Sequence, residues 1–406
     1  MALHYSNIST TFLLLSFTIL LLFYPANATS RETRERYNRV NRSWDADNPD
    51  PSQFVDIRIY RAYKVIQRFK MTIKADPQGK TATWEGPDIC KTYQGFYCEH
   101  PPDNASATAL AAIDFNEFQL EAPSVAELIS QLPDLAFFHA NSNKLGGTIT
   151  DDIAKLPYLY ELDFSNNRLT GPFPLAVLKI TGLVFLDLRF NSFVGRIPYE
   201  LFTRKTFPEL EVLFLNNNDF SYPIPDSLGE SPVNYLTFAN NRFTGGIPES
   251  IGGLGNTLIE VLFLNNQLSG CLPYQIGLLE NSAVFDAGYN RLTGRLPCAL
   301  GCLQKMEELN FAGNFLYGEI PEAVCKLGNL HNLSLSDNYF TSVGPACEAL
   351  IRKGVLDDKK NCIHGKPMQR SNEECSAFFS KPLHCPCDSW YDYVPCELAP
   401  SGSPAL

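Results

Sequence analysis

The sequence has little that would suit it to a membrane or to nucleic acid. After residue 28 it contains no run of the 18 or so consecutive apolar residues that a membrane-spanning helix needs. Lys and Arg number 33 against 44 Asp and Glu, which gives a net charge of −11. This acidic surplus argues against nucleic acid and anionic lipid surfaces as partners and leaves cationic partners open. The chain is 45% hydrophobic, which is ample for a core, so we expect a folded protein.

The start of the chain is its most apolar segment. Residues 12–22 are largely apolar, and the small-residue site Ala26-Asn27-Ala28 follows them. This order predicts a cleaved secretory signal peptide over residues 1–28. No Lys or Arg precedes the apolar run, unlike most signal peptides, and an uncleaved anchor is the alternative. We therefore expect a secreted, soluble protein of the extracellular space, whose mature chain begins with a polar segment over residues 29–53.

Twelve cysteines in a secreted chain indicate disulfide bonds rather than a redox or metal site. We expect no metal and no cofactor. Three Asn-X-Ser sequons have the form of glycan acceptors, and these are Asn41, Asn104 and Asn332.

One stretch, LPYLYELDFSNNRLTGPFP at residues 156–174, recurs along the chain. Its asparagine returns at intervals of 23 to 27 residues, at Asn143, Asn167, Asn191, Asn218, Asn241, Asn266, Asn290, Asn314 and Asn338. An imperfect copy begins near Leu110, where Phe118 stands in place of the asparagine. The sequence therefore predicts about ten coils.

Each copy follows the pattern LxxLxxLxLxxNxLxGxIP, which is that of a leucine-rich repeat. The LxL pair predicts a short strand with its leucines inward and its neighbours outward. The asparagine amide can donate and accept hydrogen bonds for buried backbone groups where the chain leaves the strand. Stacking predicts an α/β solenoid, a leucine-rich repeat horseshoe with a parallel concave sheet over residues 109–345. The GxIP ending resembles the plant-specific subclass.

Both ends of this stack need a cover. Over residues 54–108 we expect a helical N-terminal cap, with apolar residues at helical spacing at Ile57, Tyr60, Tyr63, Ile66 and Phe69. The helix, Trp84 and the close pair Cys90 and Cys98 resemble the cap that precedes plant repeats, and this resemblance implies a Cys90–Cys98 disulfide.

Over residues 346–406 we expect a Cys-rich C-terminal cap and tail, stabilised by disulfides. Seven cysteines crowd the last coils and the tail: Cys325, Cys347, Cys362, Cys375, Cys385, Cys387 and Cys396. Three more, Cys271, Cys298 and Cys302, lie within the repeats, and the sequence leaves their pairing open.

The outward positions of the predicted strands are rich in acids. The carboxylates there are Asp114, Glu117, Glu161, Asp163, Asp187, Glu260, Asp286, Glu308 and Asp337, against one base, Arg189, and one histidine, His139. Aromatic residues join them at Phe137, Phe185, Phe190, Phe214, Tyr235 and Tyr289. Exposed aromatic residues among charges are typical of interface hot spots, so we predict a ligand-binding surface for a basic peptide. The alternative is that the carboxylates only keep a broad sheet soluble. Neighbouring carboxylates could also suggest a glycosidase, but an open sheet without a deep pocket argues against an enzyme.

The repeats ELDFSNNRLTGPFPLAVLKITGLVFLDLRFNSFVGRIPYELF at residues 161–202 and the tail segments GKPMQRS and AFFSKP resemble plant leucine-rich repeat extensin proteins. That resemblance implies binding of rapid alkalinization factor peptides, which are small cationic signals, and a role in cell-wall integrity and expansion. It leaves a homodimer open. The Ser-Pro-rich extensin arm of that family is not found after the repeats in this sequence, and this departure puts the covalent anchoring that the resemblance implies in doubt.

Two other functions compete with peptide binding. The chain could inhibit wall-degrading enzymes, as the polygalacturonase inhibitors that share this repeat do, although those proteins lack the crosslinked tail. It could also associate with a cell-wall polysaccharide, although an acidic surface should repel polyuronate. A receptor kinase is not expected, because neither a membrane span nor a kinase follows the repeats.

Overall fold

A computed structural model describes residues 49–381, 385 and 391–398 of the chain. The chain divides into two units, residues 1–50 and 51–406, and the second is described below. The predicted signal peptide, residues 29–48 of the polar segment and the acceptor Asn41 lie outside the described residues. Within the described part no helix combines the length and the apolar composition needed to cross a membrane.

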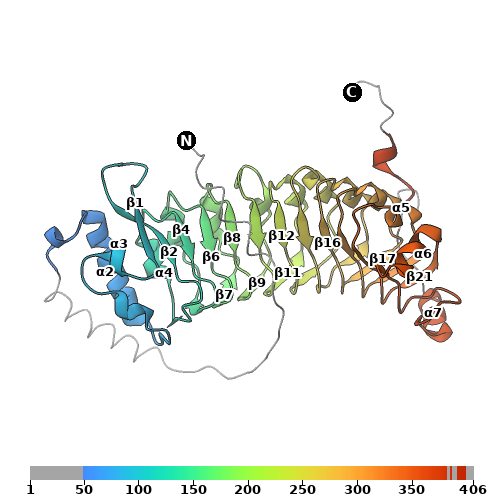
Figure 1. The fold of residues 1–406 in the computed structure, drawn as a ribbon, viewed down its shortest axis with the longest axis horizontal. Coiled ribbons are helices and arrows are strands. Elements are labelled where there is room, and N and C mark those ends of the chain that lie inside the picture. The colour runs from blue at the N-terminus through green and yellow to red at the C-terminus, as the bar shows by residue number, and fades with distance from the viewer. Residues whose placement is uncertain (1–48, 382–384, 386–390, 399–406) are drawn as a thin grey trace. The chain divides into compact units, whose positions relative to one another are not determined.

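A long sheet of twelve strands runs through the second unit (Figure 1). Its first two strands, β1 (Phe96–Glu99) and β2 (Ala109–Asp114), are antiparallel, and all later neighbours pair in parallel. This confirms the predicted parallel sheet. The later strands, in both spatial and chain order, are β4 (Phe137–His139), β6 (Glu161–Asp163), β8 (Phe185–Asp187), β10 (Val212–Phe214), β12 (Tyr235–Thr237), β14 (Glu260–Leu262), β16 (Val284–Asp286), β18 (Glu308–Asn310), β20 (Asn332–Ser334) and β22 (Leu356–Asp357).

The middle residue of each strand points into the core. Leu162, Leu186 and Leu213 stand opposite one another in register and are fully buried. Because side chains alternate along a strand, the residue on each side of the leucine points outward. Each buried leucine contributes about 2 kcal/mol through the apolar surface removed from water. The stack of leucines therefore fixes which residues form the outward face of the long sheet.

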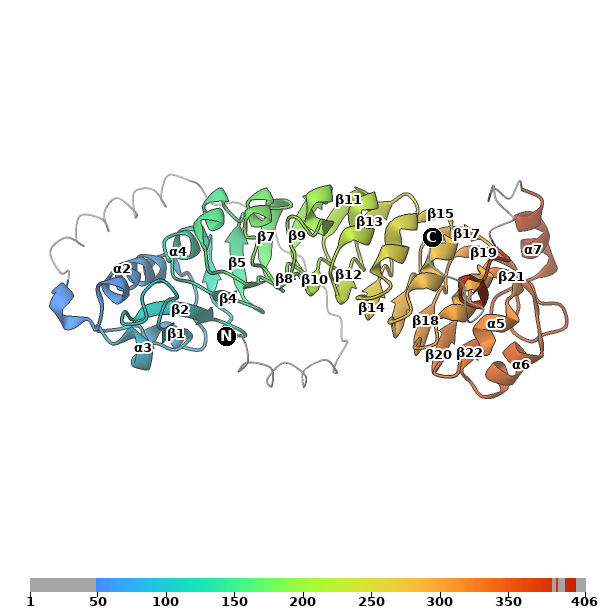
Figure 2. The same ribbon diagram turned by 90° about the horizontal axis from the view of Figure 1, so that it is seen from above.

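Two shorter sheets and a column of short helices lie away from the long sheet (Figure 2). The six-stranded sheet contains β3 (Glu121–Ala122), β5 (Lys144–Gly147), β7 (Arg168–Pro172), β9 (Ser192–Gly195), β11 (Asp219–Pro223) and β13 (Arg242–Thr244). The four-stranded sheet contains β15 (Ser269–Cys271), β17 (Arg291–Gly294), β19 (Phe315–Ile320) and β21 (Tyr339–Val343).

The short helices follow, one in each coil: α4 (Ala126–Ser130), η3 (Asp151–Lys155), η4 (Leu175–Lys179), η5 (Tyr199–Phe202), η6 (Asp226–Glu230), η7 (Glu249–Leu254), η8 (Tyr274–Leu278), η9 (Cys298–Cys302) and α5 (Glu322–Cys325). The proline of the repeat precedes most of them, as Pro198 precedes η5. Since proline has no N–H to donate to a sheet, it ends the side strand there.

A ladder of buried asparagines joins each coil to the one before it. Asn218 is typical: its Oδ1 accepts the Phe193 backbone N–H at 3.0 Å, and its Nδ2 donates to the Leu188 carbonyl at 2.9 Å and the Leu215 carbonyl at 3.2 Å. One amide thus satisfies backbone groups of two coils, which the core would otherwise leave unpaired. The other repeat asparagines make the same three kinds of bond.

The ladder extends beyond the predicted end of the repeats at residue 345. Asn361 accepts the Phe340 N–H at 3.0 Å and donates to the Leu335 carbonyl at 3.0 Å, and β22 continues the long sheet. In this coil Asp358 occupies the place of the second leucine and is buried beside Lys366 at 3.3 Å. The last coil therefore belongs structurally to the stack, although its apolar pattern is broken.

The N-terminal cap contains η1 (Pro51–Gln53), α2 (Ile57–Thr72), η2 (Lys80–Thr83) and α3 (Ile89–Thr92), followed by β1. Asp56 begins α2 by accepting the Arg58 N–H at 2.8 Å, and Trp84 is fully buried beneath the helix. The Cys90–Cys98 disulfide is present as predicted.

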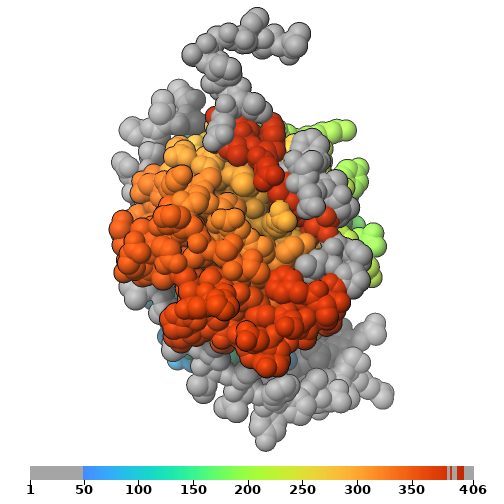
Figure 3. All heavy atoms as spheres, turned by 90° about the vertical axis from the view of Figure 1, so that its right-hand side faces the viewer, coloured from blue at the N-terminus to red at the C-terminus, as the bar shows by residue number. Residues whose placement is uncertain are grey.

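The C-terminal cap covers the other end of the stack, and Figure 3 looks onto its orange to red surface. It contains α6 (Pro345–Arg352), β22, α7 (Asn372–Phe379) and, in the tail, η11 (Pro395–Leu398). The ring of Phe378 on α7 stacks on Tyr339 of the preceding coil with centroids 3.6 Å apart. The core itself ends in buried residues of the last coils and α6, such as Phe340, Cys347 and Leu356, and α7 packs outside it.

Four further disulfides settle pairings that the sequence left open. Cys325–Cys347 and Cys362–Cys375 are local to the cap. Cys271–Cys385 and Cys302–Cys396 join the tail to coils that lie 114 and 94 residues earlier in the chain. Closing such long loops restricts the unfolded chain strongly, and the two bonds tie Cys385 and Cys396 to the repeats.

Removal of one rung should destabilise the whole stack. In Asn218→Ala the Phe193 N–H and the Leu188 carbonyl lose their partner inside the core, and we expect the free energy of unfolding to fall by about 3 kcal/mol. Urea unfolding followed by circular dichroism measures the change. Asn256 is exposed, so Asn256→Ala is the control and should stay within about 0.5 kcal/mol of the wild type. Equal effects of the two substitutions would contradict the claim that the buried amide of Asn218 stabilises the fold.

Candidate functional site

The fourteen predicted ligand-binding residues all lie on the outward side of the long sheet or on the turn that follows it. Five precede the inward leucine or its equivalent: Phe137, Glu161, Phe185, Tyr235 and Glu260. Six follow it: Asp114, His139, Asp163, Asp187, Phe214 and Asp286. Three sit on the turn just before the place of the ladder asparagine: Glu117, Phe190 and Tyr289. The predicted face therefore exists as one surface, but its residues differ in what they are free to do.

Several aspartates on this face hold the turn that follows the strand. Asp163 accepts the Ser165 N–H at 2.7 Å, and Asp286 accepts the Gly288 N–H at 2.8 Å. Asp114 makes the same bond to Asn116 at 3.0 Å. An aspartate that accepts from the N–H two residues on forms an Asx-turn, so part of the acidic bias has a structural cause. This role was not predicted from the sequence, although the spacing from the aspartate to the turn could have indicated it.

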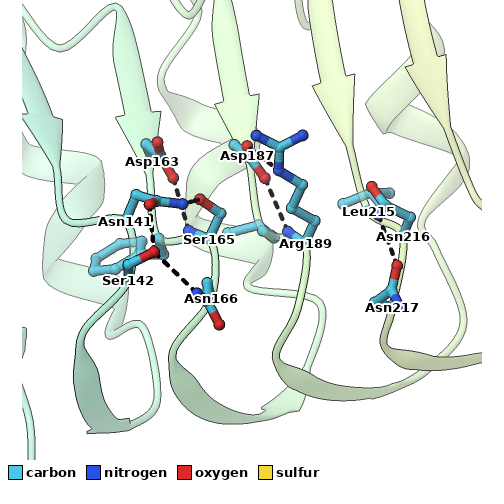
Figure 4. Close-up of polar contacts among 12 residues, drawn as sticks. Asn141, Ser142, Asp163, Ser165, Asn166, Asp187, Arg189, Leu215, Asn216 and Asn217 are labelled. Carbon is cyan, nitrogen blue, oxygen red and sulfur yellow. Dashed lines mark hydrogen bonds and ion pairs between the residues drawn. The ribbon is translucent and has the colours of Figure 1, made fainter. Parts of the chain in front are cut away.

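Asp187 is completely buried, which changes the role assigned to it. Its Oδ1 accepts the Arg189 N–H at 3.0 Å, and its Oδ2 lies 2.9 Å from Nε of the same arginine (Figure 4). Burial and the neighbouring Asp163 raise the pKa of Asp187 well above its ordinary value, although Arg189 acts in the opposite direction. Asp163 is 9% exposed. Both aspartates face outward as predicted, but neither carboxylate is open to a ligand in this structure.

The first half of the face also neutralises its remaining charge. Nε2 of His139 lies 2.9 Å from Oε2 of Glu161. Burial lowers the pKa of His139, but the hydrogen bond and charge of Glu161 outweigh it and the pKa is raised. The Arg189 guanidinium lies over the Phe214 ring, 5.0 Å from its centroid. From β4 to β10, therefore, each acid has an internal partner.

The second half of the face contrasts with this arrangement. We name its outward residues Tyr235, Glu260, Asp286, Tyr289 and Glu308 the acidic patch. Burial and the charge of Glu308 raise the pKa of Glu260. The pKa of Asp286 is raised by burial, which outweighs its hydrogen bonds from Gly288 and Asn310. Among the described residues no Lys, Arg or His forms an ion pair with these three carboxylates.

Two buried oxygen atoms beside the acidic patch lack a hydrogen-bond partner among the described residues. Thr237 is the last residue of β12 and lies on the outward side of the strand. It is 6% exposed, and its Oγ1 has no hydrogen-bond partner among the described residues. Asn216, on the turn before it, uses its Nδ2 on Asn217 and leaves its Oδ1 unpaired. Unpaired buried oxygens are unfavourable, but neither atom is open to a ligand in this structure, so both are unfavourable features of the free protein rather than binding positions. Sequence reasoning gave no signal for either residue.

Two aromatic residues on this face occupy a strained backbone position. The residue before the place of the ladder asparagine is left-handed in every coil, and most coils use Asn, Ser, Asp or Gly there, such as Asn217 and Asn240. Phe190 and Tyr289 adopt this conformation with φ of 52° while 49% and 60% of their surface is exposed. Bulky residues are rare there, and such strain is typical of binding sites.

The ring of Tyr289 has a built support. Gly313 occupies the same left-handed position in the next coil, and a Cβ placed on it would come within 2.7 Å of Cδ1 of Tyr289. Only glycine therefore leaves room for the ring against the neighbouring backbone. The ring of Tyr289 therefore packs against the backbone of Gly313, and its other side remains exposed to solvent.

The repeated coil, the asparagine ladder and the two caps define a leucine-rich repeat solenoid of the plant-specific subclass. The leucine rich repeat family model matches residues 158–179, 209–231 and 233–254. The chain belongs to the leucine-rich repeat extensin-like proteins. It is 52% identical over 351 residues to leucine-rich repeat extensin-like protein 2 of Arabidopsis thaliana, a match that covers 85% of this chain and 44% of that protein. It is 51% identical over 329 residues to protein 6 of the same series, covering 81% and 68% respectively.

Solved structures show the same fold. The chain resembles the leucine-rich repeat ectodomain of the Arabidopsis receptor kinase HAESA in complex with the IDA peptide hormone, with a TM-score of 0.57 and 24% identity. The match covers 75% of this chain and 54% of that one. This similarity supports the solenoid architecture.

The raised pKa values of Glu260 and Asp286 predict a pH-dependent stability. A carboxyl group with a raised pKa in the folded state favours folding fully below its ordinary pKa of about 4, and this stability is lost as pH rises through the raised value. The variant Glu260→Gln/Asp286→Asn should therefore melt at a higher temperature than the wild type at pH 7, with little difference near pH 3.5. Calorimetric melting at both values measures this.

The exposed pair Glu209→Gln/Glu280→Gln is the matched control for charge number, because it also removes two carboxylates. It should leave the melting temperature nearly unchanged at both pH values. An equal gain in both variants at pH 7 would show that net charge, rather than the acidic patch, limits stability.

Proposed function

We propose that this protein is an extracellular cell-wall protein that binds a cationic secreted peptide, of the rapid alkalinization factor type, on the acidic patch. The observation that carries the proposal is the contrast between the two halves of one face. On the first half Glu161 and Asp187 have cationic partners in His139 and Arg189, whereas Glu260, Asp286 and Glu308 have no cationic partner among the described residues. A cationic ligand would relieve the unfavourable charge that the free protein keeps there.

Arg189 indicates how such a cation would bind. Its guanidinium lies between the carboxylate of Asp187 and the ring of Phe214, at 2.9 Å and 5.0 Å. A basic side chain of a ligand would meet an equivalent pairing in the acidic patch, with Glu260 or Asp286 on one side and the ring of Tyr235 or Tyr289 on the other. Charge-assisted hydrogen bonds and cation–π contacts would then act together.

An extended peptide fits this surface better than a small molecule. The acidic patch spans four neighbouring strands, β12 to β18, at roughly 4.8 Å per strand. A role in wall integrity and expansion is what the resemblance to leucine-rich repeat extensin proteins implies. Five disulfides among the described residues favour an oxidising extracellular compartment.

Charge removal from the acidic patch should weaken peptide binding. Titration calorimetry with a synthetic cationic peptide of the rapid alkalinization factor type should give a Kd for Glu260→Gln/Asp286→Asn at least about 30-fold above the wild type, since two charge-assisted contacts are lost. The control Glu161→Gln/Asp163→Asn removes two carboxylates of the same face that already have partners, and its Kd should rise less than about 3-fold. The proposal fails if both variants weaken binding equally.

We expect the side chain of Tyr289 to contribute to peptide binding but not to the stability of the fold. In Tyr289→Asn the left-handed position receives the residue that neighbouring coils use, so we expect no loss of melting temperature, but a Kd at least about 10-fold higher because the aromatic contact is gone. Phe190→Asn is the matched control. It relieves the same backbone strain in the turn after β8, away from the acidic patch, and should leave the Kd unchanged. If Tyr289→Asn lowers the melting temperature and the affinity together, the ring is a packing residue.

A further inference from the structure

One exposed asparagine stands within the outward face of the long sheet. Asn332 is the first residue of β20, in register with Glu308 of the acidic patch, and it points outward because the following Leu333 is fully buried. It begins the sequon Asn-Leu-Ser, which ends at Ser334. The acceptor position therefore coincides with the edge of the proposed binding surface.

The side chain of Asn332 is arranged differently from the ladder asparagines. Ser334 Oγ donates to Asn332 Oδ1 at 3.1 Å, and Nδ2 makes no hydrogen bond to a described residue. Asn104 has the same arrangement in an exposed loop, where Ser106 Oγ donates to Asn104 Oδ1 at 2.8 Å. By contrast, Nδ2 of Asn338 is held inside the core by three carbonyl oxygens. In both sequons the nitrogen that would receive a sugar is open.

We propose that Asn332 carries an N-linked glycan that ends the binding surface at Glu308. In the reaction, Nδ2 forms a bond to the anomeric carbon of an oligosaccharide carried on a lipid diphosphate, the lipid diphosphate leaves, and Nδ2 loses one proton. The inference rests on the proposed extracellular role, because only a chain that enters the secretory pathway meets this sugar donor.

The outward residues beyond Glu308 suit a sugar better than a peptide anchor. Those of the last coils are mostly small and polar: Asn310, Ala312, Gly313, Ser334 and Ser336. They offer space and few large side chains, and the next acid, Asp337, is already paired with Arg370. A bulky, hydrated glycan on Asn332 would exclude a ligand from the last coils and confine it to β12 to β18. It would do so without covering a residue of the acidic patch.

Peptide mapping by mass spectrometry tests the site. The full chain is expressed in a secretory plant cell line and treated with an N-glycosidase that converts each glycosylated Asn to Asp. The expected result is conversion of Asn332 as well as Asn104 in the wild type, loss at residue 332 alone in Ser334→Ala, and retention in Ser334→Thr, which keeps the hydroxyl group.

An unconverted Asn332 in the wild type overturns the inference. If Asn104 is converted in the same sample, the chain has met the sugar donor and the failure concerns this site alone; peptide binding is measured separately by calorimetry and stands or falls on its own. Conversion at residue 332 that persists in Ser334→Ala would equally contradict the assigned sequon.

Discussion

The structure depends on the hydrogen bonds of the buried asparagines. Each amide satisfies an N–H and a carbonyl of the preceding coil together with carbonyls of its own, so the chain can turn off a strand inside a dry core. The ladder holds neighbouring coils in one register. That register places the outward residues of successive strands side by side, and the face can therefore act as a single surface.

The coils differ in the outward residues of their strands, and the proposed function depends on these residues. The inward leucines and the ladder asparagines repeat because stacking demands them, while the outward positions are free to vary. On one half, His139 and Arg189 pair with Glu161 and Asp187, and on the other half no described Lys, Arg or His pairs with the carboxylates. Strained aromatic residues and raised carboxyl pKa values are unfavourable for the free protein. On the acidic patch Tyr289, Glu260 and Asp286 combine these features, and a cationic ligand would offset them there.

The repeats and the parallel sheet follow from the sequence because both depend on a periodic pattern, and the Cys90–Cys98 bond was implied by the resemblance to the caps of plant repeats. The last coil was not predicted, because Asp358 replaces an inward leucine and forms an ion pair with Lys366 instead. The Cys271–Cys385 pairing could not be deduced, since it depends on where the tail returns to the stack. Alternation along a strand placed Asp187 outward, but its burial depends on the side chains of adjacent coils, which alternation does not describe.

Hydrogen–deuterium exchange tests the central claim most directly, namely that one half of the face is reserved for a cationic ligand. The full chain is compared with and without the cationic peptide. The account predicts added protection across β12 to β18 and in the turn that carries Tyr289, with no change in β4 to β8. Protection confined to β4 to β8, or to surfaces away from the long sheet, would contradict it.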